Sequence, residues 1–306
     1  MKKKILVIGG SAFVGRIFSI QTSKREEEFE LHVVNRGHYP LNLENVKEYK
    51  CDRHTPHTLA RILPDIVFDA LVDFCAYTPG EIQSLLGVLG GRIKQYIFFS
   101  TASVYAPLDH SIKRESDPVV QQAEGDSPVS DYIYNKLLLE RELIEGCGAA
   151  GIPYTIFRPT FIYGPFNYAP RESYFIELIA RKYTVPVPVD ATAKFSFVYV
   201  FDVADAVLLT IGDSRAYDNV FNLAGPERIT YERLLADFER FNGGPFQTSE
   251  VTVQQALDEH IPLPFPLTDD DLCSGEKFRD TFHFSYTPFA EGMEKTFKIF
   301  YSLFVS

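Results

Sequence analysis

Short apolar runs alternate with helix-like segments along the first half of the chain. Runs that are typical of buried strands occupy 5–8, 31–34, 66–72, 95–99 and 154–157. Between the first two runs, the spacing of one helical face is kept by Val14, Ile17, Phe18 and Ile20. Because strands that alternate with helices connect by right-handed crossovers, the pattern predicts an α/β fold with a doubly wound parallel sheet.

The pattern loosens after residue 160. Tyr163-Gly164-Pro165 is typical of a turn, and the prolines within 185–188 favour a loop or an edge strand. One more strand is expected at 197–200 and a helix from Asp202, and the proline-rich remainder reads as irregular. We therefore expect a main domain at 1–165, to which 194–215 returns. A smaller, mixed C-terminal lobe at 166–193 and 216–306 would bind the substrate.

Composition narrows the function. The formal net charge of −11 disfavours nucleic-acid binding, which needs clustered Lys and Arg. The four cysteines show no CxxC or Cys/His spacing, so we expect no metal site and reduced thiols in a cytoplasmic protein. No run approaches the roughly 20 apolar residues that a membrane-spanning helix requires.

A tyrosine and a lysine four positions apart lie in a predicted helix. Ser130 is the expected N-cap, and Gly146 and Gly148 mark the expected end. Tyr132 and Lys136 would share one face, where a cation favours the phenolate and so suits proton transfer. The alternative is an ordinary exposed pair, because one Tyr-to-Lys hit among 17 tyrosines is what composition alone produces.

The first strand leads into a glycine-containing turn that opens the first helix. Such a turn lets the backbone approach a pyrophosphate, whose charge the helix N-terminus stabilises. Ala12 stands where a middle glycine is usual, and the alternative is a purely structural turn. We predict a Rossmann-type dinucleotide site whose turn comprises Gly9, Gly10, Ser11, Ala12, Phe13, Val14 and Gly15.

The end of the second strand bears on the choice of dinucleotide. An NAD site usually places Asp or Glu there for the ribose 2′-hydroxyl, whereas this chain has Asn35 followed by Arg36. Arg36 could pair with a 2′-phosphate, which favours NADP over NAD, although a solvated loop cation is the alternative. Asp52 could accept a hydrogen bond from the adenine amino group.

Taken together, these motifs resemble the extended short-chain dehydrogenase/reductases, the NAD(P)-dependent epimerase/dehydratase-like proteins. The resemblance extends through 101–105, Arg158-Pro159, the 163–165 turn, 200–204 and 284–288. It implies that Thr101 hydrogen-bonds the reacting oxygen and that Tyr132 is the acid/base. Lys136 would bind the nicotinamide ribose and lower the pKa of Tyr132, and Arg158 would belong to the cofactor-binding set. The helix with the pair would form a homodimer interface.

Departures from that family pattern concern the substrate. Ala102-Ser103 replace the acidic pair of dehydratases, so elimination by that route is unsupported. Phe161 and Phe195 replace an asparagine and an arginine that nucleotide-sugar members usually carry. Substrate phosphates would then be poorly neutralised, which favours a less phosphorylated or more apolar substrate, with sugar nucleotides still open.

Two functions remain open from the sequence. The leading one is an epimerase or reductase that moves a hydride between nicotinamide and a secondary alcohol or ketone carbon of a small molecule. A second resemblance, of the Gly-Gly-x-x-Phe-x-Gly turn with 35–37 to chloroplast stem-loop RNA-binding proteins, suggests a non-catalytic NAD(P)-binding regulator or RNA-binding protein. Candidate substrate-binding residues are Tyr77, Asn167, Tyr168, Tyr199 and, for an anionic group, Arg171.

Overall fold

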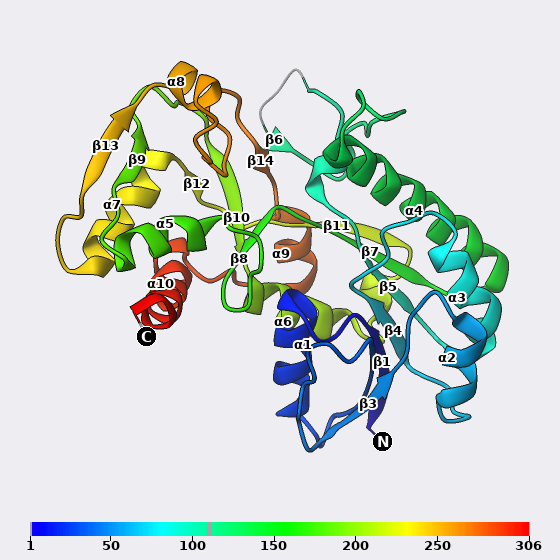
Figure 1. The fold of residues 1–306 in the computed structure, drawn as a ribbon. Helices are drawn as coiled ribbons and strands as arrows, with labels where there is room; N and C mark the ends of the chain where they lie inside the picture. Colours follow the sequence, from blue (N-terminus) through cyan, green and yellow to red (C-terminus); the bar gives the residue numbers. More distant parts are fainter. Residues whose placement is uncertain (1, 109–111, 306) are drawn as a thin grey trace.

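The computed structural model describes residues 2–108 and 112–305. In this part of the chain, seven parallel strands form the main sheet in the order β11-β7-β5-β4-β1-β2-β3 (Figure 1). Their bounds are β1 (Lys3–Ile8), β2 (Phe29–Asn35), β3 (Val46–Lys50), β4 (Ala70–Asp73), β5 (Tyr96–Phe99), β7 (Tyr154–Pro159) and β11 (Asn219–Leu223). The predicted α/β fold with a doubly wound parallel sheet is confirmed.

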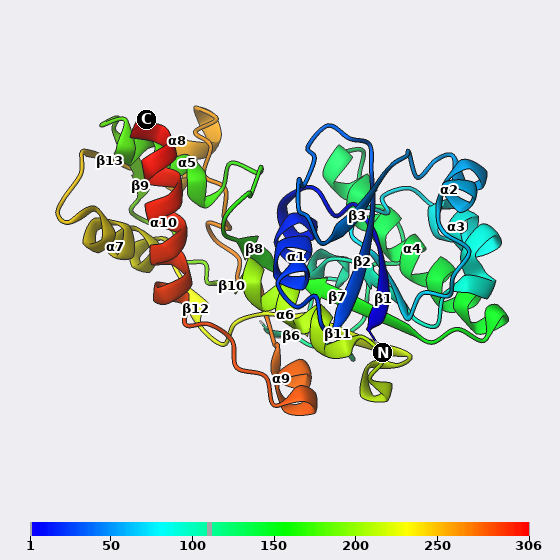
Figure 2. The ribbon, with the colours of Figure 1, turned by 90° about the horizontal axis from the view of Figure 1, so that it is seen from below.

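Alternating side chains of the strands build a core on each face of the sheet. In β1, Ile5 and Val7 join one apolar cluster, whereas Leu6 and Ile8 join the other. Figure 2 shows α1 (Phe13–Ser23) and α6 (Val200–Thr210) on one side of the sheet. The opposite side is covered by α2 (Pro56–Ile62), α3 (Glu81–Leu89) and α4 (Pro128–Ala150). Burial on both faces explains why the inner strands β4 and β5 are apolar almost throughout, whereas the edge strand β3 is polar and partly exposed.

The strand order places the reversal of the chain between β1 and β4. From β1 the chain runs outward to β2 and β3, and then crosses back to β4, β5 and β7. At such a reversal the loops that follow the two central strands diverge and leave a crevice at their carboxyl ends. The glycine turn after β1 and the segment after β4 therefore lie at the position where this fold binds ligands.

The helix that carries Tyr132 differs from its predicted bounds at both ends. Its N-cap is Ser127, whose Oγ accepts the backbone N–H of Ser130 at 3.1 Å, so the predicted cap at Ser130 is wrong. The helix continues through both predicted stop glycines to Gly151, which caps it with φ +66°. A Cβ on Gly146 would lie 2.7 Å from Leu86 Cδ1, so that glycine permits close packing against α3.

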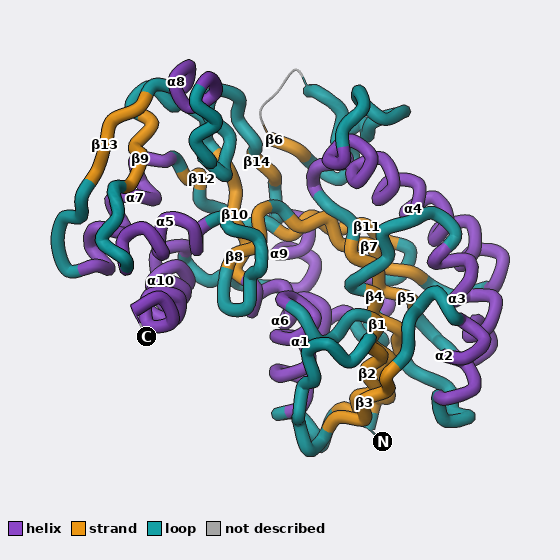
Figure 3. Tube along the Cα trace, viewed as in Figure 1, coloured by secondary structure: helices purple, strands orange, loops and turns teal. Residues whose placement is uncertain are grey.

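The smaller lobe contains three short sheets with the orders β12-β10-β8, β13-β9 and β14-β6 within the described residues (Figure 3). Its strands are β6 (Ile112–Lys113), β8 (Phe161–Tyr163), β9 (Val185–Pro188), β10 (Phe195–Tyr199), β12 (Arg228–Ile229), β13 (Thr248–Val251) and β14 (Leu272–Cys273). Its helices are α5 (Glu172–Ala180), α7 (Tyr231–Asn242), α8 (Val253–Asp258) and α10 (Phe289–Val305), whereas α9 (Glu276–Phe282) packs against β11 of the main sheet. The predicted irregular C-terminal segment therefore contains regular helices.

Two strands lie outside the ranges expected from the sequence. β11 falls within 216–306 but pairs with β7 as an edge strand of the main sheet. β10 falls within 194–215 but pairs with β8 and β12 of the lobe. The chain thus passes between the two parts more often than the sequence suggests, and this places β8 and its loop beside the crevice.

Candidate active site

The glycine turn leaves the N-terminus of α1 open. Ala12 is the N-cap, and neither it nor an acidic first-turn residue offers the helix a side-chain acceptor. A Cβ on Gly15 would lie 2.2 Å from the carbonyl oxygen of Gly9, which explains why the helix requires glycine there. Phe13 begins the helix at φ +37°, a strained conformation for a bulky residue. Free N–H groups and the helix dipole together make this end an anion site.

The polar groups at the end of β2 are arranged for a ligand. Asn35 is 7% exposed, and its Oδ1 accepts the backbone N–H of Gly37 at 2.7 Å. Its Nδ2 is buried and finds no hydrogen-bond partner among the described residues, as is also true of Ser100 Oγ after β5. Such atoms are rare in folded proteins and call for a ligand or an ordered water. The crevice therefore fits a dinucleotide.

Arg36 and Asp52 lie on the same side of the crevice. Arg36 is exposed. The pKa of Asp52 is lowered mainly by a hydrogen bond from the backbone N–H of His54, and the charge of Arg36 contributes to this lowering. Asp52 Oδ1 accepts that N–H at 2.9 Å and also lies 2.8 Å from the His54 ring. This leaves the second carboxylate oxygen of Asp52 available to an adenine amino group.

A buried ion pair that the sequence analysis missed holds the Asp52 loop against β4. Arg53 donates to both oxygens of Asp73, at 2.7 and 2.9 Å, and Tyr96 donates to the same carboxylate at 2.7 Å. The pKa of Asp73 is lowered because the charge and hydrogen bonds of Arg53 outweigh the cost of burial. An Arg directly after a predicted adenine-binding Asp was the available signal, but its partner lies 20 residues away.

Thr101 and Tyr132 lie together at one side of the crevice. Thr101 follows β5 and caps a short 3-10 turn at Ala102–Val104, with its Oγ1 accepting the backbone N–H of Ser103. Tyr132 lies in the first turns of α4 and is 39% exposed. Burial of the hydroxyl raises the pKa of Tyr132, whereas Arg171 and a hydrogen bond with Thr101 lower it. The two hydroxyls predicted to contact the substrate oxygen are thus brought together.

Lys136 is buried below Tyr132, on the same face of α4. Its Nζ donates to the backbone carbonyls of Ala76 and Phe99, both at 2.8 Å, and lies 4.5 Å from the Tyr77 ring centroid. Desolvation lowers the pKa of Lys136 to about 8. We expected Lys136 to lower the pKa of Tyr132. In the structure its ammonium is directed at two backbone carbonyls instead, and it does not contribute to the shift of the Tyr132 pKa. An ammonium has three N–H donors, so one remains for a ligand.

Aromatic residues from distant segments meet around the mouth of the crevice. The ring centroids of Tyr77 and Tyr132 are 6.3 Å apart. Burial is the main cause that raises the pKa of Tyr77, and a hydrogen bond with Tyr168 raises it further. Tyr168 in turn packs edge-on against Phe13 of the glycine turn, at 6.2 Å. The 164–171 segment of the lobe therefore reaches across to the cofactor side.

Three further residues of the lobe were predicted to bind the substrate, and the structure places them in different surroundings. Arg171, the N-cap of α5, places its guanidinium carbon 5.2 Å from the Phe161 ring centroid. Asn167 is buried, and its side-chain amide donates to Glu172 at 3.0 Å. Tyr199 is buried in the aromatic core of the lobe, 5.2 Å from the ring of Tyr163. Of these three, Arg171 is the one whose charge reaches Tyr132.

Arg158 is held by an internal partner. Its Nε and Nη2 donate to the two oxygens of Glu140 on α4, at 2.9 and 2.5 Å, and both residues are buried. The guanidinium also covers the Tyr105 ring at 4.9 Å. This pair fastens α4 to β7 and so fixes the position of the helix that carries Tyr132 and Lys136.

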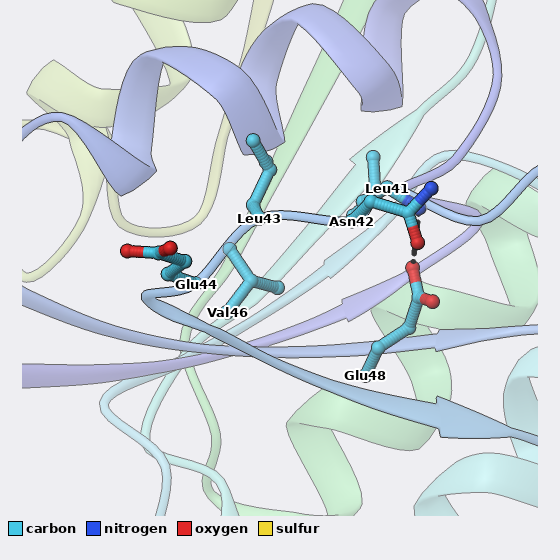
Figure 4. Close-up of a pocket in the computed structure, with 6 residues that line it drawn as sticks. All are labelled: Leu41, Asn42, Leu43, Glu44, Val46 and Glu48. Carbon is cyan, nitrogen blue, oxygen red and sulfur yellow. Dashed lines mark hydrogen bonds between the residues drawn. The ribbon is translucent and has the colours of Figure 1, made fainter.

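A separate surface cavity of about 230 Å³ lies on the β2–β3 connection. It is lined by Leu41, Asn42, Leu43, Glu44, Val46 and Glu48, and Figure 4 shows their side chains. The backbone N–H of Leu41 donates to Glu48 there at 2.9 Å. None of the predicted site residues lines it. Across residues 2–108 and 112–305 there is also no group of three metal-ligating side chains.

Comparison with known proteins identifies the family. The model of the NAD dependent epimerase/dehydratase family matches residues 5–224, so the chain belongs to this family. The family expected from the sequence motifs is thereby confirmed. The match covers the glycine turn, Thr101 and α4, so these parts of the crevice lie within the region that the family shares.

Individual relatives are more distant. The chloroplast stem-loop binding protein of 41 kDa b from Arabidopsis thaliana is 27% identical, over 80% of this chain and 64% of the relative. A UDP-glucose 4-epimerase from Lactobacillus helveticus is 24% identical, over 51% of this chain and 50% of its own length. The chain thus spans less than two thirds of either relative.

Solved structures resemble the whole fold. The UDP-glucose 4-epimerase of Thermotoga maritima, solved with UDP-glucose, has a TM-score of 0.79 at 20% identity, covering 98% of this chain and 99% of its own. The dTDP-glucose 4,6-dehydratase of Bacillus anthracis, solved with NAD, has the same TM-score at 18% identity, covering 98% and 97%. At this identity the likeness shows the fold alone.

No described helix is both long enough and apolar enough to cross a membrane.

Proposed function

We propose that this protein binds a nicotinamide dinucleotide in the crevice and exchanges a hydride with a secondary alcohol or ketone carbon of a small substrate. One observation carries the proposal. An open helix N-terminus, a buried Lys136 and the facing hydroxyls of Thr101 and Tyr132 converge at one edge of the sheet. The dinucleotide would supply or accept the hydride, and the chain would supply position and proton transfer.

Each part of the crevice has a role in this proposal. The N–H groups that open α1 hold the pyrophosphate, and Asn35 with Asp52 holds the adenosine. The third N–H of Lys136 holds the nicotinamide ribose. Since Arg158 is already bound by Glu140, we assign it to positioning α4 and leave it out of the cofactor-binding set.

Tyr132 transfers the proton. The substrate oxygen would lie between Thr101 Oγ1 and Tyr132 Oη, where both hydroxyls can hydrogen-bond it. Because burial raises the pKa of Tyr132, the phenol is protonated at neutral pH and can donate to a ketone oxygen as that carbon gains its hydride. In the reverse direction the phenolate takes the alcohol proton while the carbon loses a hydride.

We further propose that NADP binds more tightly than NAD. Arg36 is exposed beside the buried, unpaired Asn35 amide, and a guanidinium can bind a 2′-phosphate through two hydrogen bonds. Arg36→Leu should weaken NADP⁺ by about tenfold to a hundredfold and leave NAD⁺ nearly unchanged. The matched control is Arg61→Leu, an exposed arginine on α2. Tighter binding of NAD⁺ to the wild-type protein in calorimetry would refute this preference.

The two residues after Thr101 narrow the reaction class further. Ala102 and Ser103 supply no carboxylate, so we propose epimerisation or reduction in place of dehydration. Relatives named as UDP-glucose epimerases make UDP-glucose the first substrate to test, with galactose-forming activity as the readout.

We also propose a homodimer through α4, which exposes Val129 and Ile144, and a cytoplasmic location, consistent with four unpaired cysteines. Sedimentation tests the former.

A second candidate is binding of structured RNA on the same fold. The similarity to the chloroplast stem-loop binding protein favours it, and the net charge of −11 opposes it. Micromolar, salt-dependent binding of an RNA stem-loop, unaffected by Tyr132→Phe, would support this alternative.

A further inference from the structure

Arg171 lies beside the part of the crevice that holds Thr101 and Tyr132. Within residues 2–108 and 112–305, no carboxylate forms an ion pair with its guanidinium. The neighbouring acid, Glu172, is engaged elsewhere: its Oε1 accepts Gly164 N at 3.1 Å and its oxygens accept the Asn167 amide at 3.0 and 3.1 Å. Burial raises the pKa of Glu172, whereas these hydrogen bonds and the charge of Arg171 lower it.

The position of this cation is set by the wall of the lobe. Arg171 is half-buried, and its guanidinium carbon lies 5.2 Å from the Phe161 ring centroid. A cation partly removed from water without a counter-ion is unfavourable, and the ring compensates by only about 1 kcal/mol. An anion from the ligand would complete the site.

The aromatic wall leaves little room for a nucleotide diphosphate clamp. Phe195, fully buried, stacks on Phe265 at 5.0 Å with an angle of 14° between the rings. Phe161 packs edge-on against both, at 6.3 and 5.6 Å. Apolar rings therefore fill the two positions at which nucleotide-sugar members of the family usually carry an asparagine and an arginine, and Arg171 is a cation whose charge reaches Tyr132.

Arg171 also belongs to the segment that borders the crevice, because it follows by three residues Tyr168, whose ring lies 6.2 Å from that of Phe13 in the glycine turn. Its charge is one of the influences that lower the Tyr132 pKa, so the two side chains share one environment. An anion bound to Arg171 would therefore lie in the same crevice as an oxygen held by Tyr132.

We infer that the substrate is a small secondary alcohol or ketone whose carboxylate or phosphate, close to the reacting carbon, binds Arg171 while its apolar part contacts Phe161. A guanidinium can hold either oxyanion through two parallel hydrogen bonds, which fixes the carbon between Thr101 and Tyr132. This inference rests on the proposed function for the reaction, but it concerns binding and is tested by binding.

The probes are three molecules with one three-carbon skeleton: glycerol, glycerate and glycerol 3-phosphate, with UDP-glucose as a fourth. Each is titrated by calorimetry or ligand-observed NMR into the full chain saturated with the tighter-binding dinucleotide. The variants are Arg171→Gln and Arg171→Lys. The control is Arg181→Gln, which removes an exposed guanidinium at the other end of α5.

We expect glycerate or glycerol 3-phosphate to bind at least tenfold more tightly than glycerol, and the better of the two identifies the oxyanion. Arg171→Gln should lose about tenfold to a hundredfold of that affinity, Arg171→Lys less, and the Arg181 variant none. Equal binding of the charged probes and glycerol would overturn the inference, as would unchanged binding to Arg171→Gln. UDP-glucose bound more tightly than both small anions would overturn it too. Failure to bind any dinucleotide would instead refute the proposed function.

Discussion

Removing the buried Arg53 guanidinium should destabilise the fold more than any exposed substitution. In Arg53→Met, the fully buried Asp73 keeps its bonds from Tyr96 and the Cys75 N–H but loses both guanidinium bonds. A buried charge left without its partner costs about 3–5 kcal/mol. At roughly 2 °C per kcal/mol for a chain of this size, the Tm should fall by about 6–10 °C.

The pH dependence gives this prediction a second readout. In the wild-type protein the folded pKa of Asp73 is lowered, so its stabilising effect is present above the unfolded pKa of about 3.9 and is lost below it. In Arg53→Met the burial of Asp73 is opposed only by the hydrogen bonds from Tyr96 and the Cys75 N–H, so its folded pKa rises. The variant therefore loses stability as the pH rises, and its deficit should be larger at pH 8 than at pH 5.

Urea unfolding of the cofactor-free protein measures both effects, because bound dinucleotide would add its own stabilisation. Arg61→Met, an exposed site on α2, is the control and should stay within about 0.5 kcal/mol. The double variant Arg53→Met/Asp73→Asn should recover part of the loss because the charge of the buried Asp73 is then removed as well. A single-variant deficit under 1 kcal/mol, or one independent of pH, would refute the reasoning.

Two further predictions concern α4. Glu140→Gln and Arg158→Met should each lower the Tm by several degrees but change the dinucleotide affinity less than twofold. A larger loss of affinity for Arg158→Met in calorimetry would mean that Arg158 does contact the dinucleotide. Lys136 has a folded pKa of about 8, below its unfolded value of about 10.4, so its charge opposes folding below pH 8 and this penalty is relieved as the pH rises to 10. The stability of wild type relative to Lys136→Met, from urea unfolding, should therefore rise over that window; a flat difference would mean that the ammonium is not buried.

Sequence patterns predicted the parts of the fold that local physics determines. Strands β1, β5 and β7 are apolar on both faces, and the glycine turn follows directly from the close contact between Gly15 and the Gly9 carbonyl. The spacing of Tyr132 and Lys136 placed them on one helical face. These features depend on residues within a few positions of one another.

Features that depend on distant partners were not predictable in the same way. Gly146 looked like a helix end, but it lies inside α4. Glycine fits there because Leu86 of α3 occupies the space of its missing Cβ. The true start was signalled by Ser127 before a proline at the first helical position. The pairing of Arg53 with Asp73 links separate elements, and no local pattern reports it.

The direction of a side chain was the other limit. Spacing alone implied that Lys136 acts on the Tyr132 hydroxyl, whereas its ammonium is bound by the carbonyls of Ala76 and Phe99. Arg171, 39 positions from Tyr132 in the chain, supplies the charge that partly offsets the rise of the Tyr132 pKa on burial. Long-range packing of the lobe against the sheet decides such electrostatics.

The central claim is that Tyr132 transfers the proton beside a bound dinucleotide. The measurement is the rate of NADPH or NADH formation at 340 nm, with the secondary alcohol that the wild-type protein oxidises fastest, in Tyr132→Phe compared with wild type. Loss of the hydroxyl should reduce this rate by about 10²- to 10⁴-fold, with dinucleotide affinity within about twofold of wild type. A Tyr132→Phe protein that turns over at the wild-type rate would contradict the account.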